Sequence, residues 1–217
     1  MVLLASAMAA QGQSLGDVLA RMDRAAAEFR SFSADVKRTE FTAVLSEAET
    51  SSGAVRLRRV KNGLAGVMEF GEPDPRNMHF DGRTVETYYP KANRVEVIDI
   101  GKHGGAIEQF VLLGFATTAA EIRKGYDLKL GGTEELGGTA CTRIELTPKE
   151  GEARKLVTKI ELWIPDGQGN PIQEKVTTPS HDYHLFVYSN LRPNPGLPDS
   201  AFELKLPANV KRITPNR

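Results

Sequence analysis

Alternating apolar and polar residues dominate residues 53–100 and predict short β-strands joined by turns. Val55 and Leu57 alternate with arginines, which is the period-two pattern of a half-buried strand. The sequence Gly-Glu-Pro-Asp-Pro at 71–75 interrupts this pattern, because proline cannot donate a hydrogen bond to a neighbouring strand. Asp81-Gly82 is typical of a tight hairpin turn. The segment is therefore expected to form an antiparallel meander with one large apolar face.

An amphipathic helix and a strand are predicted before this meander. Ser14 can cap the helix, with Asp17 in its first turn, and one stripe of apolar residues follows at helical spacing: Leu15, Val18, Leu19, Met22, Ala25, Ala26 and Phe29. Residues 31–44 alternate again and indicate a long strand or a strand pair that includes Val44. The polar stretch 46–52 is expected to be a flexible loop.

A second helical region is predicted between residues 101 and 125. Apolar residues from Ile107 to Gly114 share a helical face, and Thr118 with Glu121 forms a capping-box pattern. The segment is short, apolar and bounded by glycines, which favours a lid, although a crossover helix has the same features.

Strand patterns return from Tyr126 to the end of the chain. We expect alternating strands up to residue 189, an irregular stretch at 190–199 and a short strand through Phe202, Leu204 and Leu206. A sheet of this size curls and encloses a hollow. The predicted fold class is α+β: an incomplete antiparallel β-barrel of about ten or eleven strands, with an N-terminal helix and a helical lid over the concave apolar face.

Composition narrows the possible functions. The 217 residues contain 28 basic and 28 acidic side chains, so no basic excess points to nucleic acid. The apolar start of the chain, with Ala7-Met8-Ala9 as a small-x-small pattern, predicts a signal peptide over residues 1–10 and one exported domain over 11–217. No later segment reaches the ~20 apolar residues of a membrane span. The single cysteine, Cys141, lies in an alternating run and is expected to be a strand residue.

Side chains that could carry chemistry are scattered. His181 and His184 would point to opposite faces of a strand, which argues against a shared metal ion. Asp81 has no serine and histidine partners in a recognised pattern, and no nucleophile elbow is present. Arg56 and Arg58 could bind an anion, but alternation favours a solvated strand face. We therefore expect a binding protein without cofactor or metal, and a secreted hydrolase is the less favoured alternative.

Five motifs resemble, in order, those of the LolA family of periplasmic outer-membrane lipoprotein carriers. Residues 31–36 (SFSADV) are similar to the family's SFSADF strand, and residues 53–59 (GAVRLRR) to its Gly-led strand ending in Lys-Arg. The later matches are 68–73, 80–90 (FDGRTVETYYP) and 202–213 (FELKLPANVKRI).

The resemblance implies an apolar cavity that shelters the acyl chains of a lipoprotein between the inner and outer membranes. Arg59 matches the family arginine that helps to hold the lid closed. The implied partners are acylated lipoproteins or other acyl lipids, an inner-membrane releasing transporter and an outer-membrane acceptor. The expected cavity lining is Val55, Leu57, Met68, Phe70, Met78, Phe80 and Tyr88, with Ile107, Phe110, Val111 and Leu113 from the lid.

Two questions stay open at this point. The period-two pattern does not decide which face of each strand turns inward. The same fold also serves envelope-stress sensors, so a regulatory interaction module is the second hypothesis.

Overall fold

The computed structural model describes residues 13–61, 63–81, 84–99 and 113–214. Its strands form one twelve-stranded sheet in the order β12-β6-β5-β4-β3-β2-β1-β11-β10-β9-β8-β7. They are β1 (Ser31–Thr42), β2 (Glu47–Val60), β3 (Gly63–Phe70), β4 (Arg76–Phe80), β5 (Thr84–Tyr89), β6 (Arg94–Asp99), β7 (Tyr126–Leu136), β8 (Thr139–Pro148), β9 (Lys159–Pro165), β10 (Gln173–Thr177), β11 (Tyr183–Pro193) and β12 (Lys211–Ile213).

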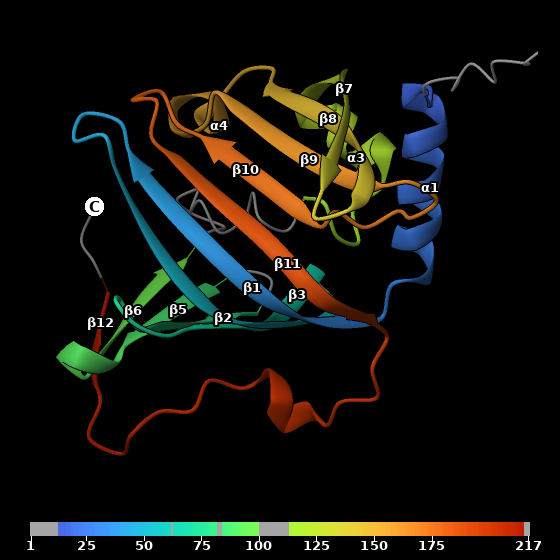
Figure 1. The fold of residues 1–217 in the computed structure, drawn as a ribbon. Coiled ribbons are helices and arrows are strands. Elements are labelled where there is room, and N and C mark those ends of the chain that lie inside the picture. The colour runs from blue at the N-terminus through green and yellow to red at the C-terminus, as the bar shows by residue number, and fades with distance from the viewer. Residues whose placement is uncertain (1–12, 62, 82–83, 100–112, 215–217) are drawn as a thin grey trace, which may run out of the picture.

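The sheet is curled and open. Every neighbouring pair is antiparallel except β12 with β6, and β12 and β7 form the two edges. The sheet bends around β1 and β11, so that its two halves face each other (Figure 1). The predicted incomplete antiparallel barrel is confirmed, with twelve strands instead of ten or eleven.

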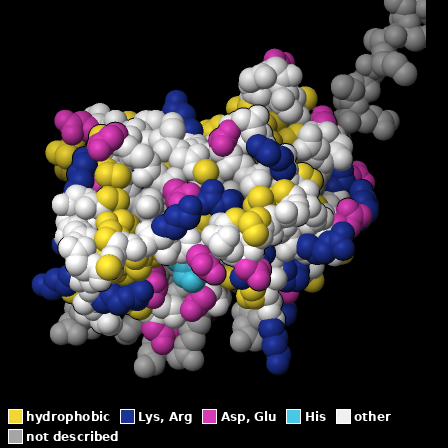
Figure 2. Space-filling view, turned by 90° about the horizontal axis from the view of Figure 1, so that it is seen from below, with side chains coloured by type: hydrophobic (Ala, Val, Ile, Leu, Met, Phe, Trp, Pro, Cys, Tyr) yellow, Lys and Arg dark blue, Asp and Glu magenta, His cyan; other side chains and the backbone are white. Residues whose placement is uncertain are grey.

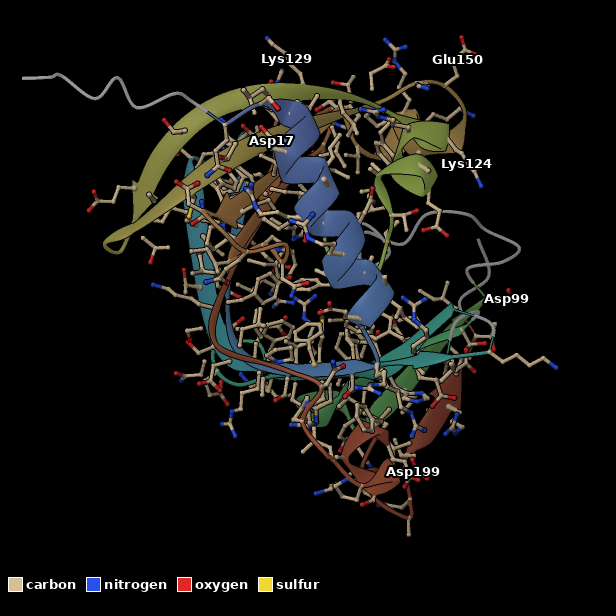
Figure 3. All side chains as sticks on the ribbon, turned by 90° about the vertical axis from the view of Figure 1, so that its right-hand side faces the viewer. Asp17, Asp99, Lys124, Lys129, Glu150 and Asp199 are labelled. Atoms are coloured by element: carbon tan, nitrogen blue, oxygen red, sulfur yellow. The ribbon has the colours of Figure 1, made fainter. Side chains whose placement is uncertain are left out.

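Helix α1 (Leu15–Glu28) spans the opening between the two halves of the sheet (Figures 1 and 3). Ser14 Oγ accepts a hydrogen bond from the main chain of Asp17, whose side chain binds back to Ser14, so the predicted cap is confirmed. The apolar stripe is buried at Val18, Leu19 and Met22. Burial of this stripe is what holds the helix against the sheet, because isolated helices of this length are marginal in water.

The shorter helices are α3 (Ala119–Gly125), α4 (Glu152–Leu156) and the 3-10 turns η1 (Pro90–Ala92) and η3 (Asp199–Phe202). The predicted capping box of α3 is confirmed, because Thr118 and Glu121 bond reciprocally. Helix α3 buries Ala119 and Ile122.

Residues 47–52 of the polar stretch belong to β2, so the predicted loop is wrong there. Strands β1 and β2 pair continuously from Ser31↔Arg58 to Thr42↔Glu47, and the turn has Ser46 at φ 54°. Val44 lies in this turn and is 88% exposed. Near the turn, the hairpin is held by main-chain hydrogen bonds between β1 and β2. These bonds need no apolar side chains, so the sequence there has no hydrophobic pattern that would predict a strand.

The C-terminal segment, residues 194–210, crosses the convex face of the sheet and leads to β12 at the far edge (Figure 1). The strand predicted over 202–206 is absent from this described stretch; Phe202 ends η3 and is buried instead. The guanidinium of Arg58 lies 4.8 Å from the Phe202 ring and pairs with Asp199, and Arg56 Nε donates to Ala201 O at 2.8 Å. Strand β11 also extends to Pro193, into the stretch predicted to be irregular.

These contacts correct the prediction of a solvated arginine face. Figure 2 looks onto this side of the molecule and shows basic and acidic side chains interspersed. Arg56 donates to Ala201 O and Arg58 pairs with Asp199, so the two arginines fasten the C-terminal segment to the sheet. The contacting residues are about 140 positions apart in the sequence, so local patterns cannot predict that the C-terminal segment covers these arginines.

Candidate functional site

The concave face of β2 to β5 is apolar, as the register shows. Val55, Met68 and Met78 lie in one row across β2, β3 and β4, and Leu57 and Phe80 flank Gly66 in the next row. Six of the predicted lining residues are at most 3% exposed and belong to one cluster: Val55, Leu57, Met68, Phe70, Met78 and Phe80. Side chains that are paired across neighbouring strands share a face, so these six face the interior together.

Tyr88 does not lie on that face, so its assignment to the lining is wrong. It pairs with Asn77, which pairs with Glu69 and then with Ala54. This row faces the convex side, with Arg56 two residues beyond Ala54. Tyr88 is nevertheless only 8% exposed. The sequence pattern missed this because Tyr88 and Tyr89 are adjacent aromatics, and a shift of one residue reverses the face.

Aromatic residues that the sequence did not single out complete the interior. Phe115 is 1% exposed; its ring stacks on Phe32 at 4.4 Å and meets Tyr188 edge-on at 5.1 Å. Phe115 belongs to the cover segment, which we define as residues 113–125. Phe32 follows the alternation of residues 31–36, whereas Phe115 lies in an irregular stretch that carries no periodic signal. The cover segment thus places an aromatic ring on the concave face.

A second apolar cluster lies beneath α1 and α3. It joins Val18, Leu19 and Met22 of α1 with Ile122 of α3 and with buried residues of β8 to β10. Leu113, predicted for the lid, packs against this cluster. The other predicted lid residues, Ile107, Phe110 and Val111, lie outside the described residues.

Arg59 connects α1 with the cover segment. Its Nη2 donates to Ala26 O at 2.9 Å and to Ala116 O at 3.3 Å, and its Nε donates to Phe29 O at 3.2 Å. The carbonyls at the end of a helix have no partners inside it and carry the negative end of the helix dipole. The last turn of α1 has no basic residue of its own, so Arg59 supplies the positive charge from β2.

Ala116, which accepts one of these bonds, has a left-handed backbone at φ 58°. For a residue with a Cβ this conformation costs of order 1–3 kcal/mol. Arg59 therefore holds a strained point of the cover segment against the end of α1. The contact consists of a few polar bonds at an exposed arginine, and such bonds can be broken at modest cost.

A charged group lies on the same face of β1 beyond the aromatic cluster. Glu40 accepts from Arg76 at 3.2 Å and lies 3.3 Å from His184 Nδ1, and Arg38 stacks over the Phe70 ring at 4.3 Å. Burial alone would raise the pKa of Glu40, but the hydrogen bond from His184 and the charges of Arg38 and Arg76 outweigh it and hold this pKa at about 2. Glu40 is therefore ionised at neutral pH.

Groups suited to catalysis do not converge in the described part of the chain. No three or more histidine, cysteine, aspartate or glutamate side chains within it are placed to hold a metal ion. His181 lies in a turn at φ 66°, not in a strand. Burial, followed by the nearby Asp166 and Glu134, raises the pKa of the Cys141 thiol, which disfavours a nucleophilic thiolate. None of the described helices has the length and apolar character that a bilayer crossing requires.

Comparison with known proteins adds evidence on the fold. No protein-family model matches the sequence, and neither does any curated protein. An uncharacterized conserved protein from Thermus thermophilus matches with a TM-score of 0.54 at 12% identity, over 94% of this chain and 100% of that one. MucB matches with a TM-score of 0.53 at 16% identity, over 90% of this chain and 64% of MucB. A DUF1329 family protein from Desulfovibrio piger matches with a TM-score of 0.50 at 16% identity, over 86% and 95%.

These three matches share the fold of this chain. A LolA superfamily protein from Nitrosomonas europaea is also among the matches, with a TM-score of 0.42 at 14% identity. At such identities the likeness extends to the architecture alone. In this curled sheet, the apolar residues predicted for the lining from β2 to β4 lie on the concave side, and Arg59 contacts the cover segment.

Proposed function

We propose that this protein is a periplasmic carrier that shelters the acyl chains of lipoproteins, or of related acyl lipids, during their transfer from the inner to the outer membrane. The observation that carries this proposal is the concave apolar face of β2 to β4, whose buried cluster includes Phe115 of a cover segment that Arg59 contacts through a hydrogen bond to Ala116 O. In this function an inner-membrane transporter supplies the cargo and an outer-membrane acceptor takes it.

Burial of hydrocarbon would provide the affinity. Each methylene removed from water contributes about 0.8 kcal/mol, so a sixteen-carbon chain has roughly 10 kcal/mol available before the costs of ordering are subtracted. Phe115 occupies part of the concave face in the closed conformation. A chain that enters must displace this ring, and part of the binding energy is used to open the cover segment.

The test compares two buried phenylalanines on opposite sides of the sheet. Phe115→Ala removes the ring from the concave face, and we expect tighter binding of a fluorescent fatty acid. Phe202→Ala is the matched control, because Phe202 is similarly buried but belongs to the C-terminal segment on the convex side. Each substitution costs about 3–5 kcal/mol of stability, so binding is measured well below the melting temperature.

Native mass spectrometry of the protein from a periplasmic fraction is the companion measurement. We expect a copurified acyl lipid or lipopeptide. Failure of wild-type protein both to retain such a molecule and to bind the fluorescent fatty acid would contradict the carrier function. Equal effects of the two phenylalanine substitutions would contradict the role given to the concave face.

A regulatory interaction module is the second candidate, and the match to MucB favours it. A structure of MucB in complex with MucA also matches, with a TM-score of 0.50 at 15% identity. Strand β7 is the last strand on its side of the described sheet, and such an edge can pair with an added peptide strand. Capture of an envelope regulatory protein by the lipid-free protein would support this alternative.

A further inference from the structure

A buried carboxyl group lies on the concave face of β10. Glu174 has no exposed surface, and its strand neighbours are Phe186 on β11 and Leu162 on β9. All three face the interior together, because residues paired across strands share a face. Within the described residues, neither side-chain oxygen of Glu174 has a hydrogen-bond partner.

The position of Glu174 is special because it separates the two apolar clusters. Phe186 belongs to the cluster of β1 to β5, whereas Leu162 belongs to the cluster beneath α1 and α3. A long apolar molecule that extends from one cluster to the other must therefore pass this carboxyl group.

A second polar group shares the site. Tyr188 is 4% exposed, and its hydroxyl also lacks a partner among the described residues. Burial, followed by the proximity of Glu174, raises the pKa of Tyr188 well above its ordinary value and that of Tyr126 to about 12. The phenols of Tyr188 and Tyr126 thus stay protonated near Glu174 and can donate hydrogen bonds.

Two unpaired polar groups inside an apolar interior require an explanation. An unsatisfied buried polar group lowers stability by about 1–3 kcal/mol, so native interiors contain few of them. An apolar side chain at either position would remove this cost. Groups of this kind are retained where function opposes stability.

We propose that Glu174 and Tyr188 form a polar subsite that donates hydrogen bonds to the carbonyl oxygen of an ester-linked acyl chain lying across the two clusters. The subsite rests on the proposed function and makes it more specific. It predicts that the protein distinguishes an acyl ester from an equally long ether-linked chain.

The donors present match a carbonyl. Burial raises the pKa of Glu174 well above its ordinary value, which favours the protonated carboxyl group, and that form can donate a hydrogen bond. A phenol donates as well, and an ester carbonyl has two lone pairs to accept both bonds. An ether oxygen is a poorer acceptor, and a hydrocarbon offers none.

The experiment measures how well two lipids displace an apolar fluorescent probe. Monopalmitoyl glycerol and its hexadecyl ether differ only in the carbonyl oxygen. For wild-type protein we expect the ester to bind about five- to tenfold more tightly, as one or two added hydrogen bonds allow. Glu174→Met should weaken this preference, because Tyr188 is then the remaining donor, whereas Glu174→Gln, whose amide still donates, should retain most of it.

Glu161→Gln is the matched control. Glu161 is a carboxylate on the adjacent strand, β9, and is only 5% exposed. Its side chain lies on the opposite face of the sheet from Glu174 and pairs with Lys159. This control should leave the ester preference unchanged. Thermal melting verifies that every variant is folded.

The outcomes separate the subsite from the carrier function. If both lipids bind and Glu174→Met keeps the wild-type preference, or if wild type shows none, the subsite is refuted and the carrier function stands. If neither lipid displaces the probe from wild type, the carrier function fails, and the subsite fails with it.

Discussion

Replacement of Arg59 by methionine tests whether this side chain keeps the cover segment closed. The substitution keeps an apolar stem and removes three hydrogen bonds, to Ala26, Phe29 and Ala116. Only the bond to Ala116 reaches the cover segment, and such a bond contributes about 0.5–1 kcal/mol at a partly exposed site. Because 1.4 kcal/mol is a factor of ten, the open state should become about two- to fivefold more populated.

Amide hydrogen exchange of peptides from residues 113–125 measures this opening directly. We expect faster exchange there in Arg59→Met, while peptides from β8 and β9 keep the wild-type rate. Arg58→Met is the matched control, because Arg58 is the neighbouring arginine and contacts Asp199 and Phe202 on the other side of the sheet. Unchanged exchange in Arg59→Met, or an equal rise in Arg58→Met, would refute the holding role of Arg59.

Three further predictions concern strain and charge. Ala116→Gly relieves the left-handed strain and should slow exchange of residues 113–125, with a gain of about 0.5–1 kcal/mol. The pKa of Glu40 is about 2 in the folded state and 4.5 ordinarily. The stability that ionised Glu40 contributes to the fold is therefore complete above pH 4.5 and is lost as pH falls toward 2. Thermal melting of Glu40→Gln should therefore depend less on pH in that range. Burial raises the pKa of Glu174, so this residue lowers the stability of the fold increasingly as pH rises above 4.5. Glu174→Gln should therefore raise the melting temperature more at pH 8 than at pH 4.

Local patterns predicted the elements that are determined by nearby residues. The capping pairs Ser14 with Asp17 and Thr118 with Glu121 form as expected, because each pair acts within a single turn. Alternation placed Val55 and Leu57 on one buried face. The open barrel followed from the number and spacing of such strands.

The failures of prediction arise from contacts that are distant in sequence. Tyr88 faces the convex side because of its register with Asn77. Phe115 reaches Phe32 from an irregular stretch, so no period signals its burial. Glu174 shares the period-two pattern of the apolar residues Ile172 and Val176, but only the fold shows that its side chain is enclosed between two apolar clusters.

Photo-crosslinking tests the central claim, that the concave face shelters acyl chains, most directly. A fatty acid with a diazirine on its chain is bound, irradiated and mapped by peptide mass spectrometry. The account predicts labels on interior residues such as Leu57, Met68 and Phe80, with none on Val67 or Val95 of the convex side. Labels gathered on the convex residues, or no saturable labelling at all, would contradict it.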